Sequence, residues 1–404
     1  MHVLLAFDKF KDSLTAPAAC EHAAAALGAA HPDWTLDLCP LADGGEGFCE
    51  ILTRAAGGTV ETHTVTGPRD TPTPATIGFV PLANIPAPAR ALLSLDIGHS
   101  SLGLPASVAL IEMATASGLA LLTPEQRDPW HTTTLGTGEL IRLAAARPGV
   151  VAILLGVGGS ATSDLGLGAL SALGLTFHSA DGAPVSPPIP AHWPQIAHLS
   201  GRLSFPTSQT LNPITVTSAP LPPIRIACDV TNPLLGPRGA AATYGPQKGL
   251  RPADLARLDH ESARLALLLC AYTGRPDSLM DLPGAGAAGG ISFGLMAAAD
   301  AKLLPGFGLV STWLDLERKL AAADLVITGE GRFDDTSLTG KGPGAVAARA
   351  LALGKPVHVF AGAVSTLAPR AHLTLHTITP AGTPLPEALR TAPALLAAAV
   401  RRAL

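Results

Sequence analysis

The chain has 404 residues, of which 47% are hydrophobic and 14% are charged, and its formal net charge is −4. This length exceeds one ordinary domain, so two α/β domains are expected. Neither a cluster nor a stripe of Lys and Arg is present, which argues against nucleic acid as the main partner. No uninterrupted apolar run reaches the about 20 residues that span a bilayer, which argues against a membrane protein.

The cysteines and the N-terminus indicate the compartment. Five cysteines are present, with no CxxC pair among them. Such a set is typical of a reduced interior and makes a zinc site unlikely. The chain enters an apolar stretch at once, without the basic segment and cleavage site of a signal peptide. We therefore expect a cytoplasmic protein.

The first elements each end in a polar loop. A strand is predicted over 3–7 and is followed by DKFKDS, which contains Lys9 and Lys11, and then by a helix over 16–27. A second strand over 35–38 leads into ADGGEG, which contains Asp43 and Glu46, and into a helix that ends near residue 56. These two acids could simply cap that helix. Alternatively they belong to a site, because ligands gather at the carboxyl ends of parallel strands.

Between residues 59 and 96 the texture changes to short alternating segments joined by turns, which predicts antiparallel strands. We place a domain boundary near residue 60. A helical, apolar setting is predicted for 110–122 around Glu112, and a helix that starts after TTTLGTGEL is predicted to run through residue 146.

The sequence LLGVGGSATSDLGLG at 154–168 follows a buried strand predicted over 150–155. Gly158 and Gly159 permit sharp turns and close approach of a ligand. The helix expected from about residue 164 directs free N–H groups into this loop, which suits a phosphate or a carboxylate. Ser160 could donate to that anion. A tight turn with Ser/Thr caps and no ligand explains the same residues equally well.

A proline-rich segment over 179–223 is predicted to have little regular structure. A strand over 224–228 then ends at Asp229, and a long turn-rich loop carries Asn232 and Lys248. Such a loop is typical of a site rather than a core. A helix is predicted over 252–271.

The last third returns to alternating strands and helices. GAGAAGG at 284–290 is a second glycine-rich loop before a helix, and it contains Gly286 and Gly289. A strand over 323–328 opens onto Glu330, and Lys341 precedes a helix over 343–353. Strands follow over 357–361 and 373–378. Both chain ends are therefore predicted to share one parallel sheet.

The predicted fold is accordingly α/β with two α/β domains. Residues 1–60 and 285–404 would form a doubly wound, mostly parallel sheet of Rossmann-like or flavodoxin-like type. Residues 61–284 would form an inserted, mixed α/β domain.

Acids, lysines and two glycine-rich loops at strand ends are the components of metal-assisted phosphoryl transfer. Only seven of the 27 basic residues are lysines, and four of these precede predicted helices. An ammonium opposes the positive end of a helix unless an anion lies between them. No Walker A sequence, protein-kinase motif set or GxSxG elbow is present. The residues alone therefore predict a phosphate-handling α/β enzyme.

Eight segments in order resemble the bacterial type I glycerate kinase family over nearly the full length. They are DKFKDSLTA, LADGGEG, EMATASGLALL, TTTLGTGEL, LLGVGGSATSDLG, CDVTNPLLGPRGAAATYGPQKG, GAGAAGG and ITGEGRFDDTSLTGK. The resemblance implies phosphorylation of D-glycerate that depends on ATP and Mg²⁺, usually giving 2-phosphoglycerate. It also implies two α/β domains with the active site in the cleft between them. Its departures are Lys9, Asp12, Ser163 and Leu165, which replace the family's Ser, Gly, Asn and Gly or Ala; they bear on substrate preference.

The site roles follow as hypotheses. Asp229 is expected to orient the attacking hydroxyl group, and Lys11 and Lys248 to bind phosphate or the glycerate carboxylate. Asp43 and Glu46 would hold Mg²⁺ or orient substrate hydroxyl groups. The substrate-binding residues would be Lys9, Glu46, Asn232 and Ser160, the ATP-binding residues would be Gly158, Gly159, Gly286, Gly289, Glu330 and Lys341, and Asp43 would also be catalytic.

Two other functions stay open at this point. One is a kinase of another small hydroxy acid, such as a hydroxypyruvate or tartronate derivative. The other is a relative that binds ligands without catalysis. The expected partners are a nucleotide and a small-molecule acceptor, with no nucleic acid and no membrane, and a homodimer is compatible with the sequence.

Overall fold

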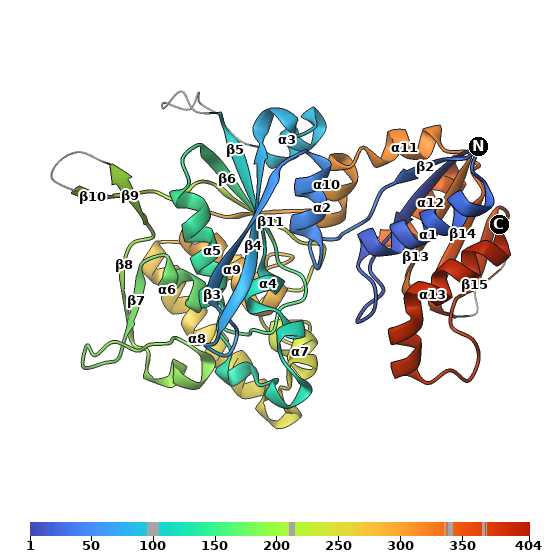
Figure 1. The fold of residues 1–404 in the computed structure, drawn as a ribbon. Coiled ribbons are helices and arrows are strands. Elements are labelled where there is room, and N and C mark those ends of the chain that lie inside the picture. Colours follow the sequence, from blue (N-terminus) through green and yellow to red (C-terminus); the bar gives the residue numbers. More distant parts are fainter. Residues whose placement is uncertain (95–104, 210–214, 335–336, 338–341, 366–367, 369) are drawn as a thin grey trace. The chain divides into compact units, whose positions relative to one another are not determined.

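The computed structural model describes residues 1–94, 105–209, 215–334, 337, 342–365, 368 and 370–404. The chain divides into two compact units (Figure 1). Met1–Asp43 and Phe307–Leu404 form the terminal unit, and Gly44–Gly306 forms the inserted unit. Both units are α/β.

The terminal unit is built on a five-stranded sheet in which every pairing is parallel, with the order β15-β14-β13-β1-β2. The first strand of the chain lies between β2 and β13, so the two chain ends share one sheet, as predicted. The strands are β1 (His2–Phe7), β2 (Thr35–Leu38), β13 (Leu325–Phe333), β14 (Val357–Val364) and β15 (Leu373–Thr377).

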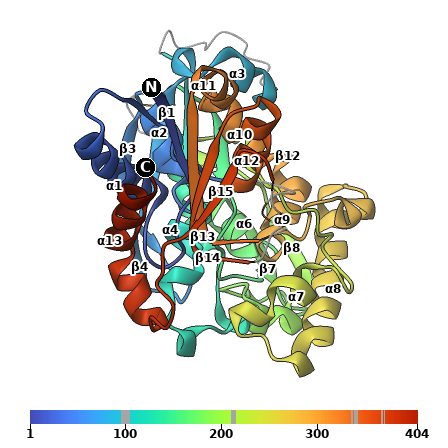
Figure 2. The same cartoon turned by 90° about the vertical axis from the view of Figure 1, so that its right-hand side faces the viewer.

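Helices cover both faces of this sheet. On one face α1 (Ala16–Ala30) and α13 (Leu385–Ala403) lie side by side (Figure 2). Alternate residues of β1 point to this face and enter a core with Leu27 and Leu396. The other face carries α11 (Leu316–Ala322) and α12 (Gly342–Ala352), and α10 (Gly306–Trp313) precedes them. A doubly wound sheet is therefore confirmed.

The inserted unit contains a six-stranded sheet with the order β12-β11-β6-β5-β4-β3. The first four strands run parallel, and β4 and β3 are antiparallel additions at one edge. The antiparallel pair lies where the sequence predicts it. The strands are β3 (Thr59–Thr66), β4 (Pro72–Pro81), β5 (Ser107–Glu112), β6 (Val150–Gly156), β11 (Ile224–Ala227) and β12 (Lys302–Leu304).

Smaller elements surround this sheet. Two further two-stranded sheets pair β7 (Leu175–His178) with β8 (His198–Gly201) and β9 (Phe205–Gln209) with β10 (Thr215–Ala219). The helices are α2 (Phe48–Ala55), α3 (Ala87–Leu93), α4 (Met113–Ser117), α5 (Leu135–Ala146), α6 (Leu167–Ala172), α7 (Ala240–Tyr244), α8 (Leu255–Thr273) and α9 (Ile291–Ala299).

Two predictions of local structure are wrong. The segment 110–122 is predicted as helical, but its first three residues belong to β5. Of the rest, Met113–Ser117 form α4 and Leu119–Leu121 form a single 3-10 turn. A short apolar run fits a buried strand and a buried helix equally well, and pairing with both β4 and β6 decides for the strand. The segment 179–223 also contains β8, β9 and β10, although it is rich in proline.

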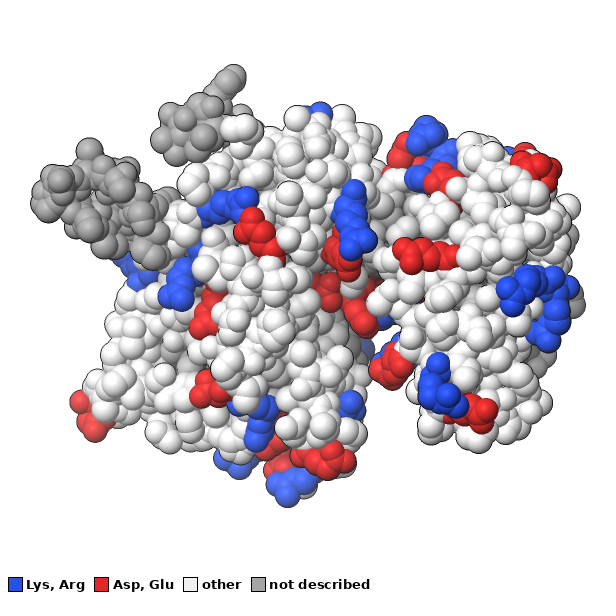
Figure 3. All heavy atoms as spheres, in the orientation of Figure 1, with Lys and Arg blue, Asp and Glu red and all other residues white. Residues whose placement is uncertain are grey.

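Charged side chains are sparse and of mixed sign on the surface drawn in Figure 3. Lysine and arginine alternate there with aspartate and glutamate, and broad areas carry neither. In the part of the chain that the structure describes, no helix is both long and apolar enough to cross a membrane.

Candidate active site

The two glycine-rich segments of the inserted unit lie against each other. The loop after β6, residues 156–166, is called the β6 loop below. Its Leu165 N–H donates to the carbonyl oxygen of Gly289 at 3.1 Å. A Cβ atom on Gly289 would lie 2.0 Å from the carbonyl oxygen of Thr162. Glycine is therefore needed at 289 because the two loops touch through their backbones.

The backbone N–H groups of two other glycines predicted to bind ATP, Gly158 and Gly286, donate to carbonyl oxygens of the protein. The Gly158 N–H donates to the carbonyl oxygen of Gly44 at 2.9 Å, and that of Gly286 donates to Asn232 at 3.0 Å. A Cβ atom on Gly158 would lie 2.5 Å from the Cα of Gly45. Internal packing accounts for these glycines, and phosphate binding at this loop stays a prediction.

Lys248 and Ser160, both predicted as site residues, are brought together from 88 positions apart. The Lys248 ammonium donates to the Ser160 hydroxyl at 2.9 Å and to the carbonyl oxygen of Thr162 at 2.5 Å. Lys248 is 1% exposed. Burial lowers its pKa from 10.5 to about 7, against the opposing effect of Asp164. The buried amino group of Lys248 thus contacts the β6 loop at two points.

Asp229 and Asn232 follow the carboxyl end of β11. Because β11 pairs with β6 in parallel, the loop after β11 and the β6 loop leave the sheet at the same edge. Asn232 organises its own loop. Its Nδ2 donates to the carbonyl oxygen of Arg238 at 2.7 Å, and its Oδ1 accepts from Tyr244 at 2.7 Å. Substrate binding by either residue stays a prediction.

Glu112 is a polar residue of this edge that sequence reasoning did not assign. It lies at the end of β5, is 5% exposed, and accepts the Gly47 N–H at 2.9 Å. The predicted Glu46, in contrast, is exposed. Glu112 could have been singled out because a lone acid in an apolar stretch is seldom buried without a partner.

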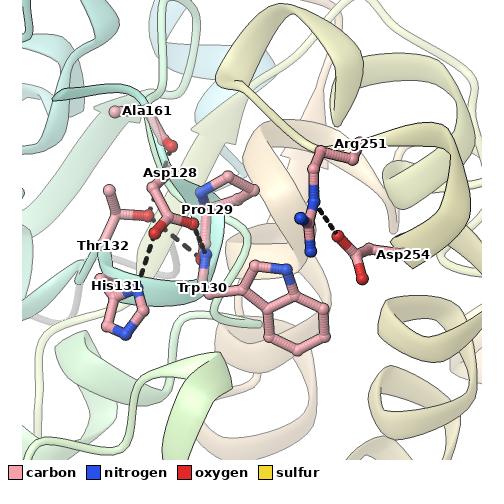
Figure 4. Close-up of polar contacts among 8 residues, drawn as sticks. All are labelled: Asp128, Pro129, Trp130, His131, Thr132, Ala161, Arg251 and Asp254. Atoms are coloured by element: carbon pink, nitrogen blue, oxygen red, sulfur yellow. Dashed lines mark hydrogen bonds and ion pairs between the residues drawn. The ribbon is translucent and has the colours of Figure 1, made fainter. Parts of the chain in front are cut away.

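The segment from Arg127 to Thr132 packs against the loop that carries Lys248. A Cβ atom on Gly249 would lie 2.2 Å from the carbonyl oxygen of Arg127. The adjoining turn is closed by Asp128, which accepts the Trp130 N–H at 3.0 Å and pairs with His131 at 2.6 Å (Figure 4). Thr132 donates from this turn to Ala161 of the β6 loop at 3.4 Å. The turn thus contacts both segments that meet at Lys248.

In the terminal unit, the negative charges of Asp8, Asp43 and Asp334 act on the carboxyl group of Glu330 in β13. This acidic cluster comprises Asp8, Asp43, Glu330 and Asp334. Burial raises the pKa of Glu330 to about 7, the Ser337 hydroxyl opposes that shift, and the negative charges of the other three acids add to it. Burial and these negative charges together favour the protonated form of Glu330.

The lysines of the first loop lie at the same edge. The Lys9 N–H donates to the Asp8 carboxylate at 2.7 Å, and the Lys11 side chain is exposed. A Cβ atom on Gly331 would lie 3.4 Å from the backbone nitrogen of Lys11, so the loop after β1 packs against the last part of β13. Lys341 lies outside the described residues.

Asp43 is the last residue of the terminal unit, whereas Glu46 belongs to the inserted unit. Their joint role in holding Mg²⁺ therefore stays a prediction. Within the described residues, no group of three or more His, Cys, Asp or Glu side chains is arranged to hold a metal ion.

Comparison with known proteins decides the family. Residues 3–404 match the model of the glycerate kinase family. The chain belongs to the glycerate kinase family. As a member it is a phosphotransferase. The family resemblance and the enzyme class predicted from the sequence are thereby confirmed.

Individual members of the glycerate kinase family are similar over most of their length. The chain is 38% identical to glycerate 2-kinase of Escherichia coli (strain K12) over 371 residues, which is 90% of this chain and 86% of that one. It is 36% identical to glycerate kinase of Bacillus subtilis (strain 168) over 365 residues, with 90% and 86% covered. A solved structure named as glycerate kinase 2 of Salmonella typhimurium LT2 is 34% identical, with a TM-score of 0.69 and coverage of 100% and 97%.

Proposed function

We propose that this protein transfers the γ-phosphoryl group of ATP to D-glycerate in a reaction that depends on Mg²⁺, with 2-phosphoglycerate as the product. The observation that carries the proposal is the match to a glycerate 2-kinase over nine-tenths of the chain. The buried Lys248 beside Ser160 supports it, because a desolvated ammonium at a strand-end loop is suited to an anionic ligand.

In this proposal Asp229 orients the attacking hydroxyl group and takes up its proton. The hydroxyl oxygen bonds to the γ-phosphorus as the bond from that phosphorus to ADP breaks, so the proton and the phosphoryl group are both accounted for. Lys11 and Lys248 neutralise phosphate oxygens or the glycerate carboxylate. Positive charge placed where negative charge develops is the main source of rate acceleration in such reactions.

Two acids of the terminal unit, Asp43 and Glu330, are assigned to Mg²⁺ in this proposal, because this ion takes oxygen ligands and usually only one or two carboxylates, with water as its other ligands. Glu330 and Asp43 would hold it there, and Glu46 is the further ligand predicted from the sequence. When bound, Mg²⁺ neutralises charge on the phosphate oxygens. Glu330 would thus face the nucleotide side, together with Lys341.

The test is ADP release in a coupled assay with ATP, MgCl₂ and D-glycerate, followed by phosphorus NMR of the product. A 2-phosphoglycerate signal is the expected result, and a 3-phosphoglycerate signal would overturn the regiochemistry. ADP release with another hydroxy acid but not with glycerate would overturn the acceptor. Nucleotide binding without any ADP release would identify a ligand-binding relative.

Asp229→Asn tests the proposed role of the acid. We expect kcat to fall by about 10²-fold or more, because the amide cannot accept the hydroxyl proton. Asp277→Asn is the matched control, since Asp277 is an exposed acid of the same unit. Near-normal turnover of Asp229→Asn would show that Asp229 does not act on the attacking hydroxyl group.

A further inference from the structure

Glu112 is a buried acid at the carboxyl end of β5, and the function proposed above assigns it no role. Its Oε2 accepts the Gly47 N–H at 2.9 Å, across 65 positions of the chain. Gly47 is the cap residue of α2, and the acid three positions on, Glu50, pairs with Arg54 instead of reaching back to it. Glu112 therefore supplies from a distant strand the acceptor that a capping box supplies locally.

The segment 44–47 lies across the carboxyl ends of three neighbouring strands of the inserted sheet. At its start, the carbonyl oxygen of Gly44 accepts the Gly158 N–H, just after β6, at 2.9 Å. A Cβ atom on Gly44 would lie 2.7 Å from the carbonyl oxygen of Ala227, the last residue of β11. At its end, Gly47 donates to Glu112, the last residue of β5. The segment is thus held at both ends by the sheet.

Glu46 is the one residue of this segment that has a side chain, and that side chain is exposed. The other three residues are glycines, of which Gly44 and Gly47 have φ values of 93° and 88°. Glycines restrict the backbone very little, so the contacts at the two ends decide its path. The N–H group that Glu112 accepts belongs to the peptide bond between Glu46 and Gly47. Glu112 therefore fixes the peptide plane next to Glu46.

The partners of Gly44 connect this segment to the predicted site residues of the same unit. Gly158 lies two positions before Ser160, and Ala227 lies two positions before Asp229. The β6 loop and the loop after β11 leave the sheet at the edge along which segment 44–47 runs. A shift of this segment would therefore move Glu46 relative to both loops.

We propose that Glu112 is a positioning residue of the phosphoryl-transfer site: through the Gly47 N–H it fixes the peptide group of Glu46, and so holds the Glu46 side chain at the sheet edge where the loops of Ser160 and Asp229 begin. This inference rests on the proposed function for the claim that Glu46 takes part in the reaction. The hold of Glu112 on segment 44–47 is a separate statement about the folded chain.

The first experiment tests this hold without any substrate, by hydrogen–deuterium exchange of peptides that contain Gly47. Glu112→Met removes the acceptor and keeps a side chain of similar length, whereas Glu112→Gln keeps an acceptor oxygen. We expect the Gly47 amide to exchange about tenfold faster or more in Glu112→Met and at a nearly unchanged rate in Glu112→Gln. Equal exchange in the wild type and Glu112→Met would overturn the hold.

Glu139→Met is the matched control, because Glu139 is a partly buried acid of the same unit that accepts the Thr66 N–H at 2.7 Å. Its partner segment carries no predicted site residue. Glu139→Met should therefore lower the melting temperature and leave the exchange of Gly47 unchanged.

The second experiment measures kcat and KM for D-glycerate and for Mg²⁺ in the ADP-release assay, at a temperature where circular dichroism shows each variant to be folded. We expect kcat/KM to fall by about 10- to 100-fold in Glu112→Met, because a small displacement of a positioning group is costly to the reaction. Glu112→Gln should stay within a few-fold of the wild type, and Glu139→Met should keep both constants. A Glu112→Met variant that only melts earlier, with unchanged constants, would assign Glu112 a structural role and overturn the proposal.

A double variant tests whether Glu112 acts through Glu46. If it does, Glu46→Ala/Glu112→Met should be no slower than Glu46→Ala alone, because the side chain to be positioned is already absent. Losses that multiply would overturn this route, and wild-type kinetics of Glu46→Ala would refute a part for Glu46 in the reaction.

If Glu112→Met does not fold, Glu112→Asp takes its place with the same expectations, since its shorter side chain withdraws the acceptor from Gly47 and keeps the acid. Absence of kinase activity in the wild type, with the change in exchange present, would refute the proposed function and leave the hold of Glu112 on segment 44–47 intact.

Discussion

Replacing Lys248 by methionine tests whether the fold carries a buried ammonium at a cost in stability. Lys248 has a pKa of about 7 in the folded chain, against an ordinary value of 10.5. Between these two values the unfolded chain holds a proton that the folded chain has released. The free energy of unfolding of the wild type therefore rises with pH across this window. The destabilisation is fully present below pH 7 and absent above about pH 10.5.

The size of the effect follows from the same two values. A separation of about 3.5 pKa units corresponds to about 5 kcal/mol over the whole window, or about 1.4 kcal/mol for each pH unit. Methionine is of similar length and does not titrate. Lys248→Met also leaves Ser160 and Thr162 without their donor, at about 1 to 3 kcal/mol for each group. That loss is independent of pH, so the slope, and not the absolute difference, carries the prediction.

Urea unfolding at pH 7.5, 8.5 and 9.5 provides the measurement. Replacing Trp34 and Trp313 of the terminal unit by phenylalanine leaves Trp130 and Trp193 to report fluorescence from the inserted unit. The wild type should gain about 1.4 kcal/mol over Lys248→Met for each pH unit. Lys302→Met, which removes an exposed ammonium of the same unit, should show no such trend. A difference between wild type and Lys248→Met that is constant with pH would refute the reasoning.

Two further predictions concern the acidic cluster and the contact between the glycine loops. The pKa of Glu330 is raised to about 7, so the folded chain binds a proton that the unfolded chain loses above pH 4.5, and the wild type should lose stability relative to Glu330→Gln between pH 5 and 8. At pH 8, MgCl₂ should raise the melting temperature of the wild type more than that of Glu330→Gln in differential scanning fluorimetry, and equal shifts would count against a cation at Glu330. Gly289→Ala places a methyl group 2.0 Å from the Thr162 carbonyl oxygen, whereas Gly182→Ala meets nothing within 4 Å at a similarly positive φ. Gly182→Ala should therefore cost about 1 kcal/mol in urea unfolding and Gly289→Ala several times more, and similar losses would show that the loops separate easily.

The sequence determined the general architecture because its signals are local. Alternation of strands and helices at both ends of the chain predicts a shared parallel sheet, and β1 indeed pairs with β13. Alternating residues after position 59 predict the antiparallel pair β3 and β4, which is present. The strand β5 was missed because a short apolar run has no period of its own, and only its neighbours in the sheet decide its conformation.

The candidate site depends on contacts between residues far apart in the chain, which composition and spacing do not encode. Lys248 and Ser160 were both predicted from their loops, yet only the tertiary structure shows that the ammonium donates to that hydroxyl. Gly289 was predicted to cradle phosphate, whereas its missing side chain makes room for the backbone at Thr162.

Asp164 shows most clearly which properties of a residue the sequence determines and which only the tertiary structure decides. In the sequence it is an acid in a glycine-rich loop, close to the point where a helix is predicted to begin. In the structure it is 0% exposed, and its Oδ2 accepts the backbone N–H and the hydroxyl group of Thr134, thirty positions away. The sequence determined that an acid stands in a glycine-rich loop, and the fold alone decided that this acid is buried and hydrogen-bonded to the start of α5, because such a contact joins residues far apart in the chain.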